Sequence, residues 1–130
     1  MINKTNQSIL LEGGTVYDPY TNTKKNASIL IENGLIKKLG NISSSKIMRT
    51  INCKNKIIAP GFIDIHAHFR EPGREDKETL ETGSIAALSG GFTRVCVMPN
   101  TNPPLDSPES ILYIIEKSID LPVKIFPIGA

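Results

Sequence analysis

The sequence predicts an α/β fold in which a small β-rich segment precedes the start of a parallel β/α barrel. Two observations support this prediction. Up to residue 58 the chain reads as short strands separated by turns, and from residue 59 strand-like and helix-like stretches alternate in the order β-α-β-α-β. That order requires parallel strands joined by right-handed crossovers. We therefore expect two domains, a β-rich, sandwich-like segment at 1–58 and the first part of a barrel at 59–130.

Turn residues between apolar stretches define the strands of the β-rich segment. Gly13-Gly14 is expected to end the first strand, and Asn33-Gly34 is a strong signal for a tight hairpin. This spacing of strands and turns is typical of a small antiparallel sheet or sandwich. The expected strands are residues 8–12, 15–17, 27–32, 35–40, 46–52 and 56–59.

The second domain is expected to alternate strands and helices. Asp76 is a suitable N-cap for a first helix, which Gly90-Gly91 ends, and Ser107-Pro108 starts a second helix with proline at its first position. The expected elements are strands at 63–70, 93–98 and 123–128 and helices at 77–88 and from 107 onward. A parallel sheet of three strands leaves long unpaired edges and a half-covered surface. We therefore expect an incomplete barrel, the front part of a longer protein, that is inactive and poorly folded alone.

Composition limits the classes of partner. The chain has 130 residues and a net charge of +2, from 15 basic and 13 acidic residues, which is too small to indicate nucleic-acid binding. No apolar run approaches the roughly 20 residues needed to cross a bilayer. Cys53 and Cys96 lie in unrelated segments without a CxxC spacing, as expected of reduced thiols. We expect a cytoplasmic protein with no membrane or nucleic-acid partner.

Both histidines of the chain, His66 and His68, lie two residues apart in a strand that reads as buried. Alternation along a strand would place them on one face with Asp64 and Arg70, and the apolar residues on the other, beneath helices. Two imidazoles so placed can bind one metal ion, although a hydrogen-bonded structural pair is the alternative. A catalytic zinc usually needs three protein ligands, so further ligands would have to come from elsewhere. The residues expected on the opposite face are Ile63, Ile65, Ala67 and Phe69.

Three polar residues accompany the histidines. Asp64 is expected to support a histidine rather than to bind metal. Arg70 is suited to bidentate binding of a carboxylate or phosphate, and the alternative is a surface arginine paired with Glu71 or Asp76. Asn100 follows the next strand, at the same rim, where loops of β/α barrels hold active sites. The alternative for Asn100 is an ordinary turn residue.

These motifs together resemble those of a known family. The stretch PGFIDIHAH at 60–68 is similar to the first metal motif of the amidohydrolase superfamily. Its continuation FREPG at 69–73, KETLETG at 77–83, GGFT at 90–93 and MPNTNP at 98–103 resemble the dihydroorotases specifically. The resemblance extends from Pro60 to Pro108, and the preceding β-rich segment also fits it.

The resemblance implies a zinc-dependent (β/α)8 TIM-type barrel that interconverts L-dihydroorotate and N-carbamoyl-L-aspartate in pyrimidine biosynthesis. It implies that His66 and His68 bind zinc, with two ions in the complete enzyme. It also implies that Arg70 and Asn100 bind the substrate carboxylate, with His68 and Phe69 beside it. The catalytic acid/base aspartate is expected downstream of Ala130, so no catalytic residue is assigned here. A homodimer or an association with aspartate carbamoyltransferase is the expected assembly.

Two other functions remain open at this point. An allantoinase or hydantoinase would share the fold and the metal, but the combination of Arg70 and Asn100 favours a substrate with an exocyclic carboxylate. A non-catalytic scaffold relative is the second alternative. Such relatives typically lose the metal-binding histidines, and this chain retains both.

Overall fold

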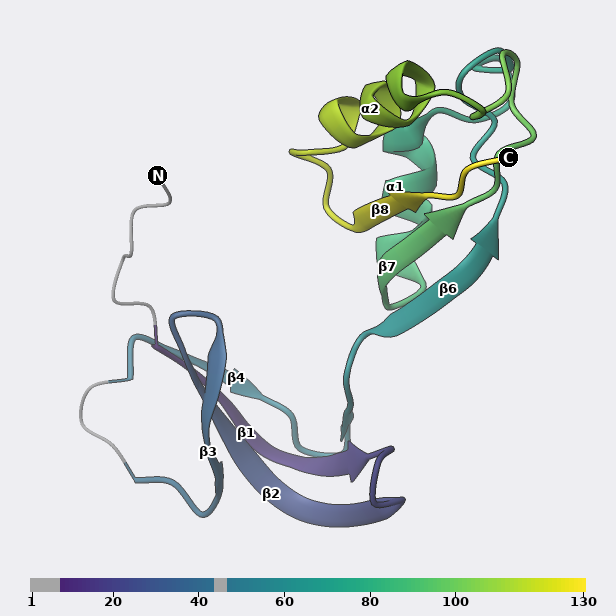
Figure 1. Ribbon diagram of the computed structural model, residues 1–130. Coiled ribbons are helices and arrows are strands. Elements are labelled where there is room, and N and C mark those ends of the chain that lie inside the picture. The colour runs from purple at the N-terminus through teal and green to yellow at the C-terminus, as the bar shows by residue number, and fades with distance from the viewer. Residues whose placement is uncertain (1–7, 44–46) are drawn as a thin grey trace. The chain divides into compact units, whose positions relative to one another are not determined.

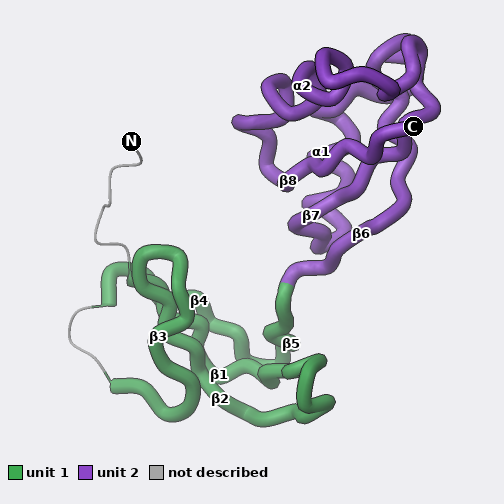
Figure 2. Tube along the Cα trace, viewed as in Figure 1, with its two compact units in different colours: residues 1–60 green, residues 61–130 purple. Residues whose placement is uncertain are grey.

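A computed structural model defines residues 8–43 and 47–130 of the chain (Figure 1). The chain divides into two compact units, residues 1–60 and residues 61–130 (Figure 2). The domain boundary expected between residues 58 and 59 lies inside the first unit, directly after its last strand. Across both defined ranges, no helix is long and apolar enough to cross a membrane.

The first unit is built on one mixed sheet rather than the expected antiparallel sheet or sandwich. In the order β3-β2-β1-β4, the first three strands are antiparallel neighbours, whereas β4 and β5 both pair with β1 in parallel. The antiparallel prediction is therefore wrong for β4 and β5. Of the strand expected at 46–52, residue 46 lies outside the described residues. The strands are β1 (Ser8–Asp18), β2 (Thr23–Glu32), β3 (Leu35–Gly40), β4 (Arg49–Asn52) and β5 (Ile57–Ile58).

Glycines have two different roles in this sheet. Asn33 and Gly34 both have positive φ, 51° and 78°, which confirms the tight hairpin between β2 and β3. Gly13-Gly14 does not end the first strand as expected, because β1 continues through it with a shift in register. A β-carbon on Gly14 would lie 2.6 Å from the side chain of Ile58, so this glycine allows β5 to approach β1.

The second unit confirms the predicted β-α-β-α-β order. Its three strands form a parallel sheet in the order β6-β7-β8, and the two helices lie next to β7 and β8 (Figure 1). The elements are β6 (Phe62–Ala67), α1 (Leu80–Ser89), β7 (Phe92–Val97), α2 (Pro108–Lys117) and β8 (Lys124–Pro127).

The start of α1 differs from the prediction. Thr79, not Asp76, is the N-cap, because the hydroxyls of Thr79 and Thr82 each accept a hydrogen bond from the other residue's backbone N–H. Asp76 instead forms an ion pair with Arg74, at 2.9 Å, in the preceding loop. The second helix begins as predicted, with Ser107 as N-cap and Pro108 in the first turn.

The core of the second unit lies between the helices and the strands β7 and β8. Phe69 joins this core from just beyond β6, but Ile63 and Ile65 are 56% and 74% exposed. The expectation that those two residues pack beneath helices is therefore wrong. The reason is that β6 is an edge strand, and the helices pack on its neighbours. The buried core residues are Phe69, Leu80, Val95, Val97, Leu105, Ile114, Val123 and Ile125.

Candidate functional site

The two histidines lie close together at the carboxyl end of β6. His66 is the second-last residue of β6, and His68 is the first residue after the strand. Their ring centroids are 5.1 Å apart, and the ring planes are inclined at 65°. His66 is exposed and His68 is half-buried. Both rings are thus accessible from one end of the sheet, the carboxyl end of the parallel strands. This is the end at which open α/β sheets bind their ligands.

A local irregularity, rather than simple alternation, arranges this end of β6. From Asp64 to Ala67 the strand takes three steps while its partner takes two, from Val95 to Val97. This register pairs Asp64 with Val95 and Ala67 with Val97, so the simple alternation that would place Asp64 on one face with both histidines is interrupted between these residues. The cause is local, because the Asp64 carboxylate accepts a hydrogen bond from the His66 backbone N–H at 2.9 Å.

Asn100 contacts the histidine pair directly. It follows β7, and its Oδ1 lies 2.9 Å from Nδ1 of His68. Because an amide oxygen only accepts hydrogen bonds, Nδ1 of His68 donates in this contact, and in the neutral ring the lone pair is then on Nε2. The amide nitrogen of Asn100 is the group left to donate elsewhere. The structure therefore brings together two of the predicted site residues from different strands.

Arg70 presents an exposed and unengaged guanidinium. The alternative of a surface pair with Glu71 or Asp76 does not occur, because Glu71 binds other groups and Asp76 pairs with Arg74. Throughout the described ranges, no side chain forms a hydrogen bond or ion pair with the Arg70 guanidinium. Its backbone is fixed, however, since its carbonyl accepts a hydrogen bond from the Arg74 N–H at 3.0 Å. Arg70 is thus a cation on a fixed backbone, and the described residues provide no anion for it.

Phe69 and Arg70 are neighbours with opposite environments. The Phe69 side chain is only 7% exposed and packs against α1, where a β-carbon on Gly83 would lie 2.9 Å from its ring. This close contact explains why a glycine occurs at position 83, inside the helix. The ring of Phe69 therefore anchors the strand end, while Arg70 faces solvent.

The sequence suggests Glu71 only as a surface partner for Arg70, and the structure gives it a different role. In the structure it is 2% exposed, and its carboxylate accepts hydrogen bonds from the Leu80 backbone N–H, the Tyr113 hydroxyl and the Lys117 ammonium. One signal for this cluster is present in the sequence. Tyr113 and Lys117 are four residues apart, and this spacing places a hydroxyl and a cation on one face of α2. Nothing in the sequence near Glu71 indicated that they meet it.

The charges of this cluster shift two pKa values in opposite directions. Burial raises the pKa of Glu71, but hydrogen bonds from Lys117, Leu80 and Tyr113 outweigh burial and hold that pKa below its ordinary value. The hydrogen bond to Glu71 raises the pKa of Lys117, and the Tyr113 hydroxyl adds to the effect. Both groups are therefore charged at neutral pH, as a partly buried ion pair.

The donor set of the histidine pair is suited to zinc but is only part of a coordination shell. Imidazole nitrogen is a preferred zinc ligand, and His68 has its Nε2 lone pair available. Within the described part of the chain, no three His, Cys, Asp or Glu side chains are grouped closely enough to hold a metal ion. His66 and His68 can therefore supply two ligands, with the others coming from elsewhere.

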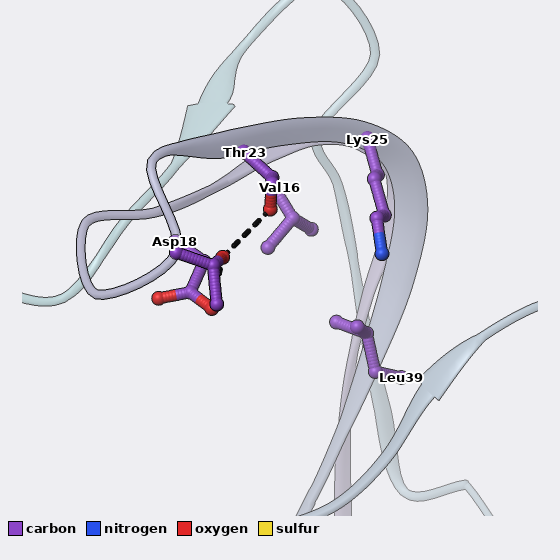
Figure 3. A pocket seen from close by; sticks show the side chains of 6 residues that line it. Val16, Asp18, Thr23, Lys25 and Leu39 are labelled. Atoms are coloured by element: carbon purple, nitrogen blue, oxygen red, sulfur yellow. Dashed lines mark hydrogen bonds between the residues drawn. The ribbon is translucent and has the colours of Figure 1, made fainter.

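The first unit contains a shallow hollow of about 200 Å³ near the turn between β1 and β2 (Figure 3). Its polar groups already bind one another, since Asp18 accepts a hydrogen bond from the Thr21 hydroxyl at 2.8 Å, and the Thr21 and Thr23 hydroxyls are 2.9 Å apart. Val16 and Leu39 supply apolar walls. The hollow lacks a grouping comparable to the histidines, so the end of β6 is the better candidate site.

Comparison with known proteins identifies a family and several relatives. The family model described as "Dihydro-orotase-like" matches residues 55–125. The dihydroorotase of Aquifex aeolicus is 44% identical over 110 residues, covering 85% of this chain and 26% of that protein. The dihydroorotase of Solibacter usitatus is 45% identical over 123 residues, covering 94% and 29%.

Solved structures share the fold. An L-hydantoinase (dihydropyrimidinase) from Arthrobacter aurescens has a TM-score of 0.85 at 23% identity and covers 96% of this chain and 28% of its own. An N-acyl-D-glutamate deacylase from Bordetella bronchiseptica, solved with zinc and a phosphonate inhibitor, has a TM-score of 0.69 at 18% identity and covers 97% and 30%. Over the part compared, the fold is that of hydantoinase-like hydrolases.

With the family model matching more than half of its residues, the chain belongs to the dihydroorotase-like family. It spans under a third of the length of the relatives that it matches, 26% and 29% for the two dihydroorotases above.

Proposed function

We propose that residues 61–130 supply one part of the active site of a zinc-dependent dihydroorotase. The reaction is the reversible hydrolysis of L-dihydroorotate to N-carbamoyl-L-aspartate, a step of pyrimidine biosynthesis in the cytoplasm. The observation that carries the proposal is the 2.9 Å contact between His68 and Asn100, which joins a zinc-ligand candidate to a carboxylate-binding candidate. Membership of the dihydroorotase-like family supports the same reaction.

The proposed architecture is a (β/α)8 barrel that opens with β6. The parallel order β6-β7-β8 with intervening helices supports it, and so do the hydantoinase-like neighbours. In such barrels the strand ends that carry His68 and Asn100 belong to the catalytic face. The exposed edge and face of β6 are consistent with further strands covering it.

In this proposal His66 and His68 hold zinc, which when bound supplies Lewis-acid polarisation of the ring amide carbonyl. The chain's own contribution is to orient the ligands. Asp64 fixes the backbone at His66 through its 2.9 Å hydrogen bond. Asn100 orients the His68 ring through the hydrogen bond at Nδ1, so that Nε2 is the nitrogen left to bind zinc.

The substrate's exocyclic carboxylate is proposed to bind Arg70. Its guanidinium is exposed and has no intramolecular partner in the described ranges, and its planar fork fits a carboxylate with two parallel hydrogen bonds. The amide nitrogen of Asn100 is the second donor. Because the ring of Phe69 is buried, we propose that Phe69 meets the substrate through its main chain. The general acid/base is proposed to be an aspartate beyond residue 130.

No local carboxylate takes the acid/base role in this proposal. Asp76 is bound to Arg74, and Glu75 accepts a hydrogen bond from the Gly73 N–H at 2.9 Å. Glu71 is buried and bound to Lys117. Each is engaged in a hydrogen bond or ion pair of the loop between β6 and α1.

The test is an assay of the complete protein that carries residues 1–130. We expect hydrolysis of dihydroorotate, loss of activity with a chelator, and recovery on adding zinc. The second candidate is a hydantoinase-type cyclic amidase, which the TM-score of 0.85 to L-hydantoinase favours. Turnover of hydantoin or allantoin without turnover of dihydroorotate would select that candidate. Zinc binding without turnover of any of these would select a non-catalytic scaffold, for which a complex with aspartate carbamoyltransferase is the proposed assembly.

A further inference from the structure

The Glu71 carboxylate connects three segments of the second unit. Its Oε2 accepts a hydrogen bond from the N–H of Leu80, the first residue of α1, at 2.7 Å. Its Oε1 accepts from the Tyr113 hydroxyl at 3.0 Å and from the Lys117 ammonium, both on α2. Lys117 also donates to the Tyr113 hydroxyl at 3.0 Å. One side chain of the β6–α1 loop is therefore bound to both helices.

This cluster fixes the backbone on one side of Arg70. Glu71 is 2% exposed and follows Arg70 directly, while Phe69, 7% exposed, precedes it. The two neighbours are held by different means, the Phe69 ring by packing against Gly83 and the Glu71 carboxylate by hydrogen bonds. The Arg70 side chain lies between two buried anchors and is itself exposed.

The same loop is bonded to the segment that carries Asn100. The Pro72 carbonyl, next to Glu71, accepts a hydrogen bond from the Asn102 N–H at 3.0 Å. Gly73, at φ +100°, is so close to that segment that a β-carbon would lie 2.1 Å from the Asn102 carbonyl oxygen. A displacement of Glu71 would therefore be transmitted to both carboxylate-binding candidates, and most directly to Arg70.

A stabilising role alone does not account for a buried charge in this place. Ion pairs removed from water gain little net stability over apolar side chains of similar size, because desolvation offsets their attraction. Charge-assisted hydrogen bonds are directional, however, and fix the geometry of the groups that they join. Glu71 uses both of its oxygens in this way, toward groups 9, 42 and 46 residues away in the chain.

We propose that Glu71 is a positioning residue that sets the orientation of Arg70 toward the substrate carboxylate, with Tyr113 and Lys117 as its supports. The inference rests on the proposed function for its substrate. Glu71 does not touch the substrate in this proposal and acts through Arg70. Its removal therefore weakens substrate binding, and it does so only while Arg70 is present.

The experiment measures KM and kcat for dihydroorotate in the complete, zinc-loaded protein. Glu71→Gln keeps the shape and an acceptor oxygen but removes the charge that holds Lys117. We expect KM to rise about tenfold, which corresponds to about 1.4 kcal/mol, with kcat within about twofold of the parent. In an Arg70→Ala background the same substitution should change KM by less than about twofold, because the group it positions is gone.

A matched control comes from the same loop. Asp76→Asn removes the exposed carboxylate that pairs with Arg74 and should leave KM unchanged. Tyr113→Phe removes one hydroxyl donor to Glu71 and should raise KM in the same direction by a smaller factor, again only with Arg70 present. If Glu71→Gln fails to fold, Tyr113→Phe decides the question in its place.

Three outcomes of the kinetic measurements would overturn the inference. They are an unchanged KM in the folded variants, a KM effect that persists in full without Arg70, and an equal effect from Asp76→Asn. If the parent does not hydrolyse dihydroorotate, the proposed function fails, and amide hydrogen exchange then judges the inference. Glu71→Gln should speed exchange at the Arg74 and Asn102 N–H groups, which bond to the Arg70 and Pro72 carbonyls, while Asp76→Asn should not. Unchanged exchange would also overturn it.

Discussion

Two loops of this chain are each organised by a carboxylate, and they use it differently. In the β1–β2 turn of the first unit, exposed Asp18 accepts hydrogen bonds from the Tyr20 N–H and the Thr21 hydroxyl, two and three residues away. In the β6–α1 loop of the second unit, buried Glu71 binds groups as far as 46 residues away, including the ammonium of Lys117. The first carboxylate holds only its own turn, whereas the second joins the loop to two helices.

The difference shows where a loop can serve chemistry. The carboxylate in a turn held by its own residues is exposed and is engaged by its neighbours in the chain. A loop held by distant buried groups can leave one side chain unengaged, as the β6–α1 loop leaves the Arg70 guanidinium. The expected consequences are that substitutions of Arg70 or Glu71 in the second loop change function or stability, and that substitutions in the first loop change neither appreciably.

The largest expected effect is at the histidines at the carboxyl end of β6, where the second loop begins. His66→Ala removes one of the two zinc-ligand candidates, so the complete protein should lose most of its bound zinc and nearly all turnover of dihydroorotate. Metal analysis by mass spectrometry, alongside the assay, checks this. Thr21→Ala, in the β1–β2 turn, should change neither quantity. Full zinc occupancy in His66→Ala would contradict the ligand assignment.

The second-largest effect is expected for Arg70→Ala. Loss of a charge-assisted carboxylate clamp should weaken substrate binding by about 2 kcal/mol, which is a rise in KM of roughly 30-fold. Arg74→Ala is the matched control, because Arg74 lies in the same loop but already pairs with Asp76. Steady-state kinetics on both variants checks the prediction. A KM for Arg70→Ala within about twofold of the parent would mean that another group binds the carboxylate.

The contrast between the loops also explains what the sequence could predict. The Asn33-Gly34 hairpin and the Ser107-Pro108 helix start both depend on residues within a few positions of one another, and local chemistry identifies them. The alternation of strands and helices after residue 59 is likewise a local pattern, and the parallel order of the second sheet follows from it. These features were predicted from the sequence.

Features that depend on contacts between residues far apart in the chain were not predicted from the sequence. The parallel pairing of β4 with β1 and the burial of Glu71 join residues some 40 positions apart or more. The N-cap was assigned to Asp76 because acidic caps are common, but Arg74 engages it and leaves the role to Thr79. The site residues His66, His68, Arg70 and Asn100 were selected from motifs, and the contact between His68 and Asn100 became visible only in the structure.

A smaller effect is expected on stability. Glu71→Ala leaves the buried Leu80 N–H without its acceptor at the start of α1, which should lower the free energy of unfolding by about 1–3 kcal/mol. Asp18→Ala removes exposed hydrogen bonds that water can replace, so its unfolding midpoint should not change measurably. Urea unfolding of both variants checks the comparison. Equal losses would show that burial does not distinguish the two carboxylates.

The smallest effect is a difference in pH dependence. The pKa of Glu71 is held below its ordinary value of 4.5 by hydrogen bonds that outweigh burial, and the Thr21 hydroxyl first, then the Tyr20 N–H, lowers the pKa of Asp18 below 3.8. A carboxyl group whose pKa is lower in the folded state binds protons more weakly there. Its contribution to stability is therefore complete above the unfolded pKa and is lost as pH falls through the folded pKa. For Glu71 the loss begins as pH drops below 4.5, and for Asp18 only below 3.8.

The measurement is the unfolding midpoint of the parent, Glu71→Gln and Asp18→Asn from pH 6 to about pH 3. The stability difference between the parent and Glu71→Gln should be constant at the upper end of this pH range and should narrow as the pH falls. The difference between the parent and Asp18→Asn should stay small and should narrow only at lower pH. If the Glu71→Gln difference is independent of pH across this range, the ion pair with Lys117 does not hold the loop, and the two loops differ in burial alone.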